Sequence, residues 1–146
     1  MSVERRAYLD TSALAKWYLN EPGSEAFTSF LQALDVGVIS SLTRTEMRSL
    51  LSRRRRMGEL TTELESVLFS AFLEDIDRGW LQLYPVDDAR FAEAANLISR
   101  HPQQPLRTLD ALHLAQAVQA DIQLIATADA VMADAATSMG LEVARF

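Results

Sequence analysis

The sequence contains no cysteine, only 5 glycines and 4 prolines, and no apolar run that approaches the roughly 20 residues needed to span a bilayer. The lack of cysteine excludes a disulfide framework and a thiolate metal site, and it fits a reducing cytoplasm. With 49% hydrophobic residues, the chain is neither disordered nor of low complexity. The apolar run before Asp10 is too short for the core of a signal peptide. We therefore expect a soluble, cytoplasmic protein that does not associate with membranes.

Lysine is almost absent, because Lys16 is the only one and the other 13 of the 14 basic residues are arginines. The net charge of −6 argues against broad, phosphate-driven binding of nucleic acid, which depends on many Lys and Arg contacts. It does not exclude a local basic strip, since four arginines are consecutive, Arg53 to Arg56. This run fits a solvated helix end that complements the helix dipole and equally fits a contact to nucleic acid or to a partner.

The length of 146 residues fits one domain, residues 1–146, with a single core. Five strands are predicted by short apolar runs, at residues 7–9, 36–39, 81–84, 123–126 and 141–144. The segments between these runs have helical periodicity. Such alternation implies an α/β fold in which a parallel sheet is covered by helices on both faces.

Residues 41–78 are predicted to form a helical hairpin. Its first helix spans Ser41 to Arg56, Gly58 ends it, and the second helix spans residues 61–78. Hydrophobic ridges of this type often pair subunits, so we expect a homodimer. Further along the chain, Thr108 is expected to start a helix from 109 to 120.

Four acidic residues stand where alternating strands and helices would bring them together: Asp10, Glu46, Asp110 and Asp129. Asp10 and Asp129 each follow a short apolar run and precede a helical segment. Both are therefore expected at the carboxyl ends of parallel strands, where open α/β sheets place their chemistry. Carboxylates that converge on one point repel each other and raise each other's pKa unless something positive lies between them. A divalent metal such as Mg²⁺ or Mn²⁺, which prefers oxygen ligands, is the natural occupant.

Helix capping is the competing explanation for each aspartate taken singly, because Asp10 and Asp129 precede helices and Asp110 falls in a first turn. Glu46 is not at a capping position, and as a set the four residues favour the metal site. Thr108 fits a helix N-cap and an active-site role equally well. His113 shares the helix face of Asp110, which suggests a general base, but a packing histidine is the stronger expectation.

Five short stretches of the sequence resemble, in the same order, the motifs of the PIN-domain ribonucleases, specifically the VapC-type toxins of type II toxin-antitoxin systems. The resemblance covers essentially the whole chain. The stretches are Tyr8-Leu9-Asp10-Thr11-Ser12-Ala13-Leu14, Asn20-Glu21-Pro22-Gly23-Ser24-Glu25, Ser41-Leu42-Thr43-Arg44-Thr45-Glu46, Thr108-Leu109-Asp110-Ala111-Leu112-His113-Leu114-Ala115 and Thr127-Ala128-Asp129.

The resemblance implies a three-layer, PIN-like fold with a five-stranded parallel sheet of order 3-2-1-4-5 flanked by helices. The acidic pocket is then expected at the carboxyl edge, near the first and fourth strands. The resemblance also implies an endoribonuclease that depends on Mg²⁺, with Mn²⁺ as the alternative metal. Members of this family are held inactive by a small antitoxin and commonly form dimers. The expected partners are therefore an RNA substrate, a cognate VapB-like antitoxin and a second copy of the chain.

Carried over residue by residue, the four acidic residues match the family's catalytic, metal-binding positions. We expect Asp10 and Asp110 to be the closest metal ligands, with Glu46 and Asp129 acting through water. Small polar residues that match the family's positions around them, and that would hold waters or orient the carboxylates, are Thr11, Ser12 and Thr108. Arg44 and Arg48 are expected at the pocket rim, where they would contact RNA phosphates. The role of Asp134 is left open.

Two other protein classes that cluster aspartates at strand ends fail on single residues. A phosphoacceptor receiver domain needs a lysine at a late strand end, whereas Lys16 lies in the first helical segment. A haloacid-dehalogenase-like phosphatase needs a second aspartate two residues after the first, where Ser12 stands. The alternative that remains is a catalytically inactive PIN-like module that binds RNA or protein.

Overall fold

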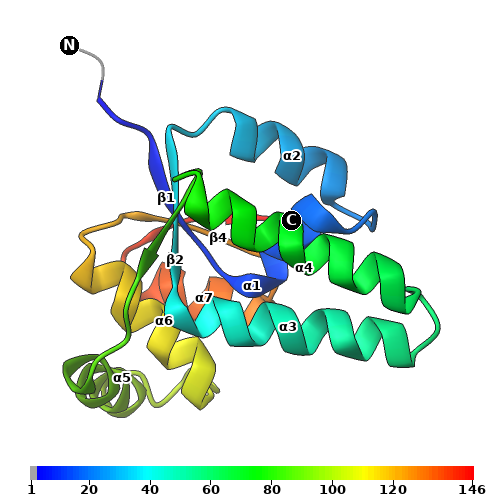
Figure 1. Cartoon of the computed structure of the whole chain (residues 1–146). Coiled ribbons are helices and arrows are strands. Elements are labelled where there is room, and N and C mark those ends of the chain that lie inside the picture. Colours follow the sequence, from blue (N-terminus) through cyan, green and yellow to red (C-terminus); the bar gives the residue numbers. More distant parts are fainter. Residues whose placement is uncertain (1–2) are drawn as a thin grey trace.

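The computed structural model describes residues 3–146, and in this part of the chain seven helices surround one five-stranded sheet (Figure 1). The strands are β1 (Arg6–Leu9), β2 (Val36–Ser40), β3 (Leu81–Tyr84), β4 (Leu124–Thr127) and β5 (Glu142–Arg145). The helices are α1 (Thr11–Tyr18), α2 (Ser24–Gln32), α3 (Ser41–Arg56), α4 (Thr62–Asp77), α5 (Asp88–Arg100), α6 (Thr108–Gln119) and α7 (Ala130–Ser138).

Every strand pairing in the sheet is parallel, and the order is β3-β2-β1-β4-β5. The predicted order 3-2-1-4-5 is therefore confirmed, and each end of each predicted strand lies within one residue of the observed end. Because β1 is central, its carboxyl end lies between those of β2 and β4. The segments that follow these three strands therefore meet at one edge of the sheet.

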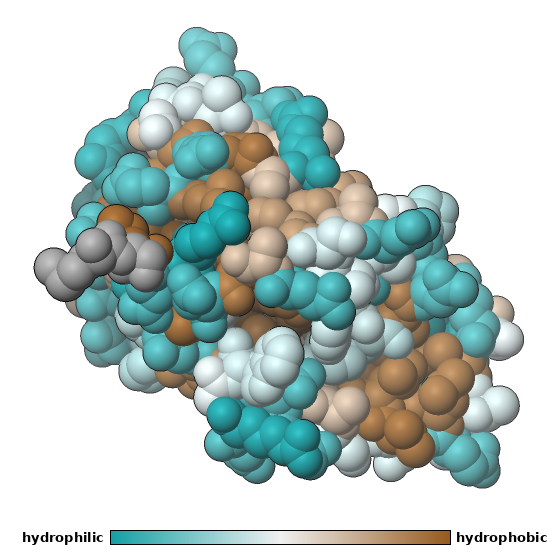
Figure 2. All heavy atoms as spheres, turned by 90° about the horizontal axis from the view of Figure 1, so that it is seen from above, coloured by the Kyte–Doolittle hydropathy of each residue, from teal (hydrophilic) through white to brown (hydrophobic). Residues whose placement is uncertain are grey.

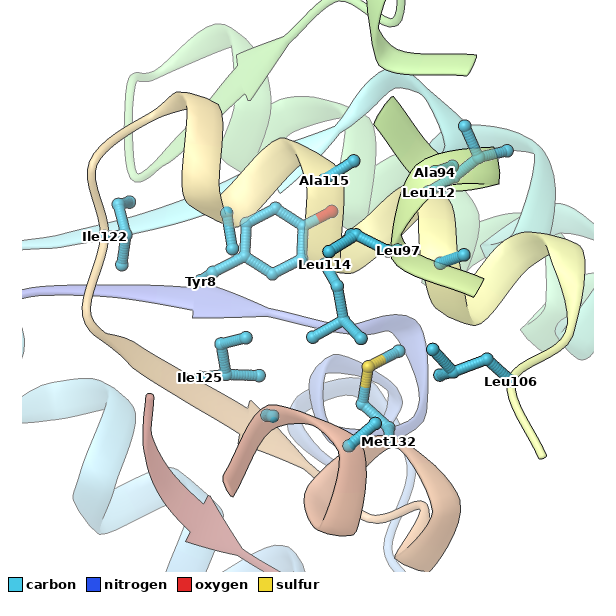
Figure 3. Packing of buried hydrophobic residues seen from close by; sticks show 14 of the residues in the cluster. Tyr8, Ala94, Leu97, Leu106, Leu112, Leu114, Ala115, Ile122, Ile125 and Met132 are labelled. Atoms are coloured by element: carbon cyan, nitrogen blue, oxygen red, sulfur yellow. The ribbon is translucent and has the colours of Figure 1, made fainter. Parts of the chain in front are cut away.

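The alternation of side chains along β1 divides the interior into two hydrophobic clusters, one on each face of the sheet. Ala7 and Leu9 belong to the cluster that α1, α2, α3 and α4 cover. Tyr8 points to the opposite face and belongs to the cluster covered by α5, α6 and α7. Figure 3 shows this second cluster, with the ring of Tyr8 between β1 and α6. The result is the expected arrangement of helices, sheet and helices.

The helical hairpin is present as α3 and α4, and its ends have the predicted chemistry. The side chain of Ser40 caps α3, and that of Thr61 caps α4 by accepting a hydrogen bond from the backbone N–H of Leu64 at 3.1 Å. Gly58 follows α3 with a φ of 82°, a left-handed conformation that glycine adopts without strain. The helix predicted from 109 begins one residue earlier, at Thr108, and its N-cap is Arg107, so the N-cap role considered for Thr108 is wrong.

Three large hydrophobic side chains are exposed on or beside the hairpin, namely Met57, Leu64 and Val67. In Figure 2 a hydrophobic patch occupies the lower right of the surface, the end of the molecule at which Figure 1 places the α3–α4 hairpin. None of the helices in residues 3–146 combines the length and the apolar character needed to cross a membrane.

Candidate active site

A pocket of about 710 Å³ lies at the carboxyl edge of the sheet, where α1, α3, α6 and α7 begin. All four predicted acidic residues line it, and so do the three small polar residues predicted around them. These seven residues are Asp10, Thr11, Ser12, Glu46, Thr108, Asp110 and Asp129. The structure therefore brings together side chains from positions 10 to 129 of the chain.

Asp10 is buried at the end of β1, where its side chain also caps α1. Its Oδ1 accepts hydrogen bonds from the hydroxyl of Ser12 at 2.7 Å and from the backbone N–H of Ala13 at 2.9 Å. Its Oδ2 accepts a hydrogen bond from the hydroxyl of Thr127. Burial raises the pKa of Asp10 above its ordinary value, although these three hydrogen bonds work in the opposite direction.

Glu46 lies on α3 and reaches the pocket from the other side of β1. Its Oε1 accepts hydrogen bonds from the hydroxyl of Thr11 at 2.9 Å and from Nε2 of His113 at 2.5 Å. Burial works to raise the pKa of Glu46, but the hydrogen bonds from His113 and Thr11 work in the opposite direction and outweigh it. The net result is a lowered pKa, so Glu46 is a carboxylate at neutral pH.

Asp110 and Asp129 both lie close to the guanidinium of Arg107. Arg107 places its Nε 3.6 Å from Oδ2 of Asp110 and a terminal nitrogen of its guanidinium 3.8 Å from Oδ2 of Asp129. The backbone N–H of Arg107 also donates to Oδ2 of Asp110 at 3.2 Å. Asp129 in turn caps α7 by accepting from the backbone N–H of Val131 at 2.9 Å. Helix capping and a place in the pocket are therefore not exclusive.

Repulsion between carboxylates is not among the causes of the pKa shifts of Asp10 and Glu46. The raised pKa of Asp10 is caused by burial, and the pKa of Glu46 is lowered. His113 donates a hydrogen bond to Glu46, and the guanidinium of Arg107 lies within 4 Å of both Asp110 and Asp129. Neither residue was assigned this role from the sequence.

The pocket fits a hard divalent cation, because four carboxylates line it and its one histidine, His113, already has both ring nitrogens hydrogen-bonded. Oε2 of Glu46 and Oδ1 of Asp110 accept no hydrogen bond from any residue in 3–146, so both atoms are available. In that same part of the chain, however, no three acidic, histidine or cysteine side chains are close enough together to form a ready-made metal cage. An open site of this kind suits Mg²⁺, which keeps several waters and takes one or two carboxylates plus substrate phosphates.

The predicted contacts of Arg44 and Arg48 with the pocket are not observed, because neither residue lines it. Arg48 instead pairs with Glu65 at 2.9 Å and lies 5.0 Å from the centre of the Phe69 ring. The reason is helical periodicity. The side of α3 that faces the pocket carries Thr45, Glu46, Ser49, Leu50 and Arg53.

Two basic residues do line the pocket, Arg53 from the arginine run and Arg107. The other arginines of the run point in different directions. Arg54 pairs with Glu21 at 2.7 Å, and Arg55 pairs with Glu65 at 2.5 Å. Only the spacing of Arg53, eight residues after Thr45 on the same helix, could have pointed to it. Asp134, whose role was left open, forms a surface ion pair with Arg145 at 2.5 Å and lies outside the pocket.

Thr127 was missed, and the hydrogen bond of His113 to Glu46 was not predicted, because the partners of both residues are distant in sequence. Thr127 reaches Asp10 through the pairing of β1 with β4. His113 is buried as expected for a packing residue, but both of its ring nitrogens are hydrogen-bonded, one of them to Glu46. Thr108 lines the pocket without a hydrogen bond of its own side chain to any described residue.

Comparison with known proteins agrees with this geometry. Residues 7–137 match the model of the PIN domain family. Ribonuclease VapC46 of Mycobacterium tuberculosis is 34% identical over 142 residues, which cover 93% of this chain and 94% of that protein.

Two solved structures share the fold at low sequence identity. VapC20 of Mycobacterium tuberculosis, a toxin that cleaves the sarcin-ricin loop, has a TM-score of 0.74 at 17% identity, covering 96% of this chain and 99% of that one. VapBC2 from Rickettsia felis, bound to a promoter DNA fragment, has a TM-score of 0.69 at 13% identity, covering 97% and 98%. The family match and the full-length relative together show that this chain belongs to the PIN domain family, as a member of the VapC type.

Proposed function

We propose that this protein is a metal-dependent endoribonuclease toxin that cleaves RNA and is neutralised by a cognate antitoxin. The observation that carries the proposal is the convergence of Asp10, Glu46, Asp110 and Asp129 on one pocket at the carboxyl edge of the sheet. Its full-length relative VapC46 is named a ribonuclease, which supports the same reaction. Ribonucleases of the PIN domain family generally depend on a divalent metal. Mg²⁺ is the proposed metal here, with Mn²⁺ as a substitute.

The carboxylates have different tasks in this proposal. Asp10 and Asp110 would hold the metal most closely, while Glu46 and Asp129 would act through its waters. When bound, the metal supplies a water that ionises near neutral pH and positive charge for the phosphate. Thr11, Ser12 and Thr127 keep the carboxylates oriented through their hydroxyl groups, as the hydrogen bonds to Glu46 and Asp10 indicate. Thr108, also in the pocket, would hold a water.

The RNA backbone would meet the pocket at Arg53 and Arg107, the two arginines that line it. Arg53 is exposed and forms no ion pair with any residue of the described chain, so its guanidinium is available to a phosphate. Arginine suits this task because its planar group binds phosphate in a bidentate manner. These two residues replace Arg44 and Arg48 in the proposed RNA contact.

Two protein partners complete the proposal. Related structures such as VapBC2 of Rickettsia felis contain a toxin with its antitoxin. A VapB-like antitoxin of this protein would place a basic side chain in the acidic pocket and so substitute for the charge of the metal. A second copy of the chain would cover the exposed hydrophobic residues of the α3–α4 hairpin, Leu64 and Val67. A toxin with an RNA target and such a partner would act in the cytoplasm.

The test is RNA cleavage by the purified protein, freed of antitoxin, on a pool of cellular RNAs. Reactions would contain Mg²⁺, Mn²⁺ or EDTA, and an Asp10→Asn variant prepared in parallel would report contaminating nuclease. We expect cuts at discrete positions that require the metal and disappear in the variant. If no RNA is cut, the protein is a non-catalytic PIN-like module, and if the variant cuts equally, the activity belongs to a contaminant.

A further inference from the structure

We propose that His113 is a positioning residue that, together with Tyr8 behind it, fixes the carboxylate of Glu46 so that it presents a single oxygen to the pocket. This inference rests on the proposed function, since it concerns the same carboxylates. It adds a buried chain of hydrogen bonds that runs from Tyr8 through His113 to Glu46. The proposed metal chemistry alone does not require this chain.

This chain of hydrogen bonds is formed by three residues from three elements. Nε2 of His113 lies 2.5 Å from Oε1 of Glu46, and Nδ1 lies 2.5 Å from the hydroxyl of Tyr8. The rings of Tyr8 and His113 also meet edge to face, with 5.6 Å between their centres. Tyr8 is fully buried and His113 is 3% exposed, so the described residues surround both. The imidazole is therefore held at both nitrogens in a rigid setting.

These two contacts select one tautomer of the neutral imidazole. A phenol hydroxyl can donate to an unprotonated ring nitrogen, and a carboxylate can only accept. The neutral form that satisfies both contacts carries its proton on Nε2, where it donates to Glu46, and accepts the Tyr8 proton at Nδ1. Tyr8 thus acts on Glu46 indirectly, by setting which nitrogen of His113 is the donor.

Glu46 needs such support more than the other carboxylates do. Asp10 and Asp129 are fixed as helix caps, and Asp110 is fixed in the first turn of α6 by the backbone N–H of Arg107. Glu46 lies inside α3, beyond its first turn, and has a longer side chain with more rotamer freedom to lose. It is the one member of the set that no helix N-terminus holds.

The hydrogen bonds divide the two oxygens of Glu46 by role. Oε1 accepts from both Thr11 and His113, whereas Oε2 accepts from no residue in 3–146. Oε2 is consequently the atom left for a metal-bound water or the substrate. A histidine that served only to pack α6 against the sheet would need no polar partner, and its neighbours Leu112 and Leu114 show that leucine fits this helix.

The experiment compares three variants. His113→Leu removes the donor, His113→Gln keeps an N–H group near the place of Nε2, and Tyr8→Phe removes only the hydroxyl. His101→Gln, at the chain's other histidine and outside the pocket, is the control. Each protein is examined by ¹⁵N NMR of the imidazoles, by titration with Mn²⁺ in the absence of RNA, and by cleavage kinetics.

We expect the wild-type spectrum to show His113 as the Nε2–H tautomer, and Tyr8→Phe to lose this preference. His113→Leu should lower Mn²⁺ affinity or kcat by about 10–100-fold with a smaller change in KM, and His113→Gln should recover most of the loss. If His113→Leu fails to fold, Tyr8→Phe and His113→Gln decide the matter.

The inference is overturned if His113 samples both tautomers in the wild type, or if folded His113→Leu binds Mn²⁺ and cleaves as the wild type does. Failure of the proposed function would look different. In that case the wild type cleaves no RNA, while the NMR and Mn²⁺ measurements still show whether His113 fixes Glu46.

Discussion

Thr127 donates a hydrogen bond from its hydroxyl to Oδ2 of Asp10, across 117 positions of the sequence. The contact exists because β1 and β4 are parallel neighbours in which Leu9 is paired with Ala126. The next residues, Asp10 and Thr127, therefore lie side by side at the same edge of the sheet. Even with this hydrogen bond, burial raises the pKa of Asp10. The ionised form of this carboxylate therefore destabilises the folded protein.

Replacing Asp10 by Asn should therefore stabilise the metal-free protein at pH 7, by about 0.5–2 kcal/mol. The folded pKa of Asp10 is raised, so the native state binds more protons than the unfolded state at intermediate pH. Stability of the wild type is then lost as pH rises from about 4, the unfolded pKa, through the folded pKa. The advantage of the variant should be absent at low pH and reach a plateau above the folded pKa.

Urea unfolding at a series of pH values measures this difference, with Asp134→Asn as the control for an exposed aspartate in a surface ion pair. Added Mg²⁺ should make the wild type the more stable protein, because Mg²⁺ binds and stabilises the wild type, whereas the variant lacks one of the proposed metal ligands. An Asp10→Asn protein that is less stable than the wild type at pH 7 without metal would contradict this account.

Arg53 and Arg44 offer a matched pair on α3. Both are exposed and neither forms an ion pair with a described residue, but only Arg53 lines the pocket. Arg53→Ala should weaken RNA binding about tenfold and reduce the slope of log K against log salt by about 1. Arg44→Ala should change neither. Fluorescence anisotropy in an Asp10→Asn background, which keeps the RNA intact, measures both quantities, and equal effects at the two positions would rule out a contact specific to Arg53.

The strands and two of the four carboxylates could be predicted from local patterns, whereas the strand order came from the resemblance to the PIN-domain ribonucleases. Short apolar runs mark each strand, and an aspartate that follows such a run within a few residues is expected at the carboxyl edge of a parallel sheet, as found for Asp10 and Asp129. The hairpin could be predicted for a similar reason, because Gly58 and the helical spacing of its apolar residues are adjacent signals.

The remaining parts of the site depend on rotations and pairings that no local pattern encodes. Arg48 and Arg53 are five residues apart on one helix, and only the rotation of α3 about its axis decides which of them faces the pocket. His113 meets Glu46 across 67 positions of the sequence, because α6 and α3 both line the pocket at the carboxyl edge of the sheet. Thr127 gains its role from the register of β1 with β4.

Glu65 should stabilise the hairpin that forms one wall of the pocket. Its buried carboxylate accepts hydrogen bonds from Arg48 at 2.9 Å and from Arg55 at 2.5 Å. In Glu65→Gln the amide nitrogen would face one of these guanidinium groups, donor against donor. We expect a loss of about 1–3 kcal/mol, which lowers Tm by about 2–4 °C per kcal/mol. Glu63→Gln, on an exposed face of the same helix, should leave Tm unchanged, and a similar decrease in both variants would show that Glu65 has no special role.

The exposed hydrophobic residues of the hairpin predict a dimer. Val67 is 61% exposed on α4, beside Leu64. Val67→Asp would place a charge in the contact and should convert a dimer to a monomer at micromolar concentration, as measured by light scattering. Ser99→Asp adds the same charge at an exposed position of α5 and should leave the dimer intact. A wild-type protein that is only monomeric at this concentration would contradict the prediction.

Arg107 would compete with the proposed metal for Asp110 and Asp129, since its guanidinium lies within 4 Å of one oxygen of each. Its side chain is largely exposed, so the pairs are weak, worth up to about 1 kcal/mol. Arg107→Ala should therefore tighten Mn²⁺ binding in the absence of RNA by at most about fivefold, and the gain should fade at high ionic strength. Calorimetric titration measures the affinity. Arg100→Ala removes the same charge from an ion pair outside the pocket, at 2.6 Å from Glu93, and isolates the effect of net charge. If the two variants bind Mn²⁺ equally, Arg107 does not occupy the place of the metal.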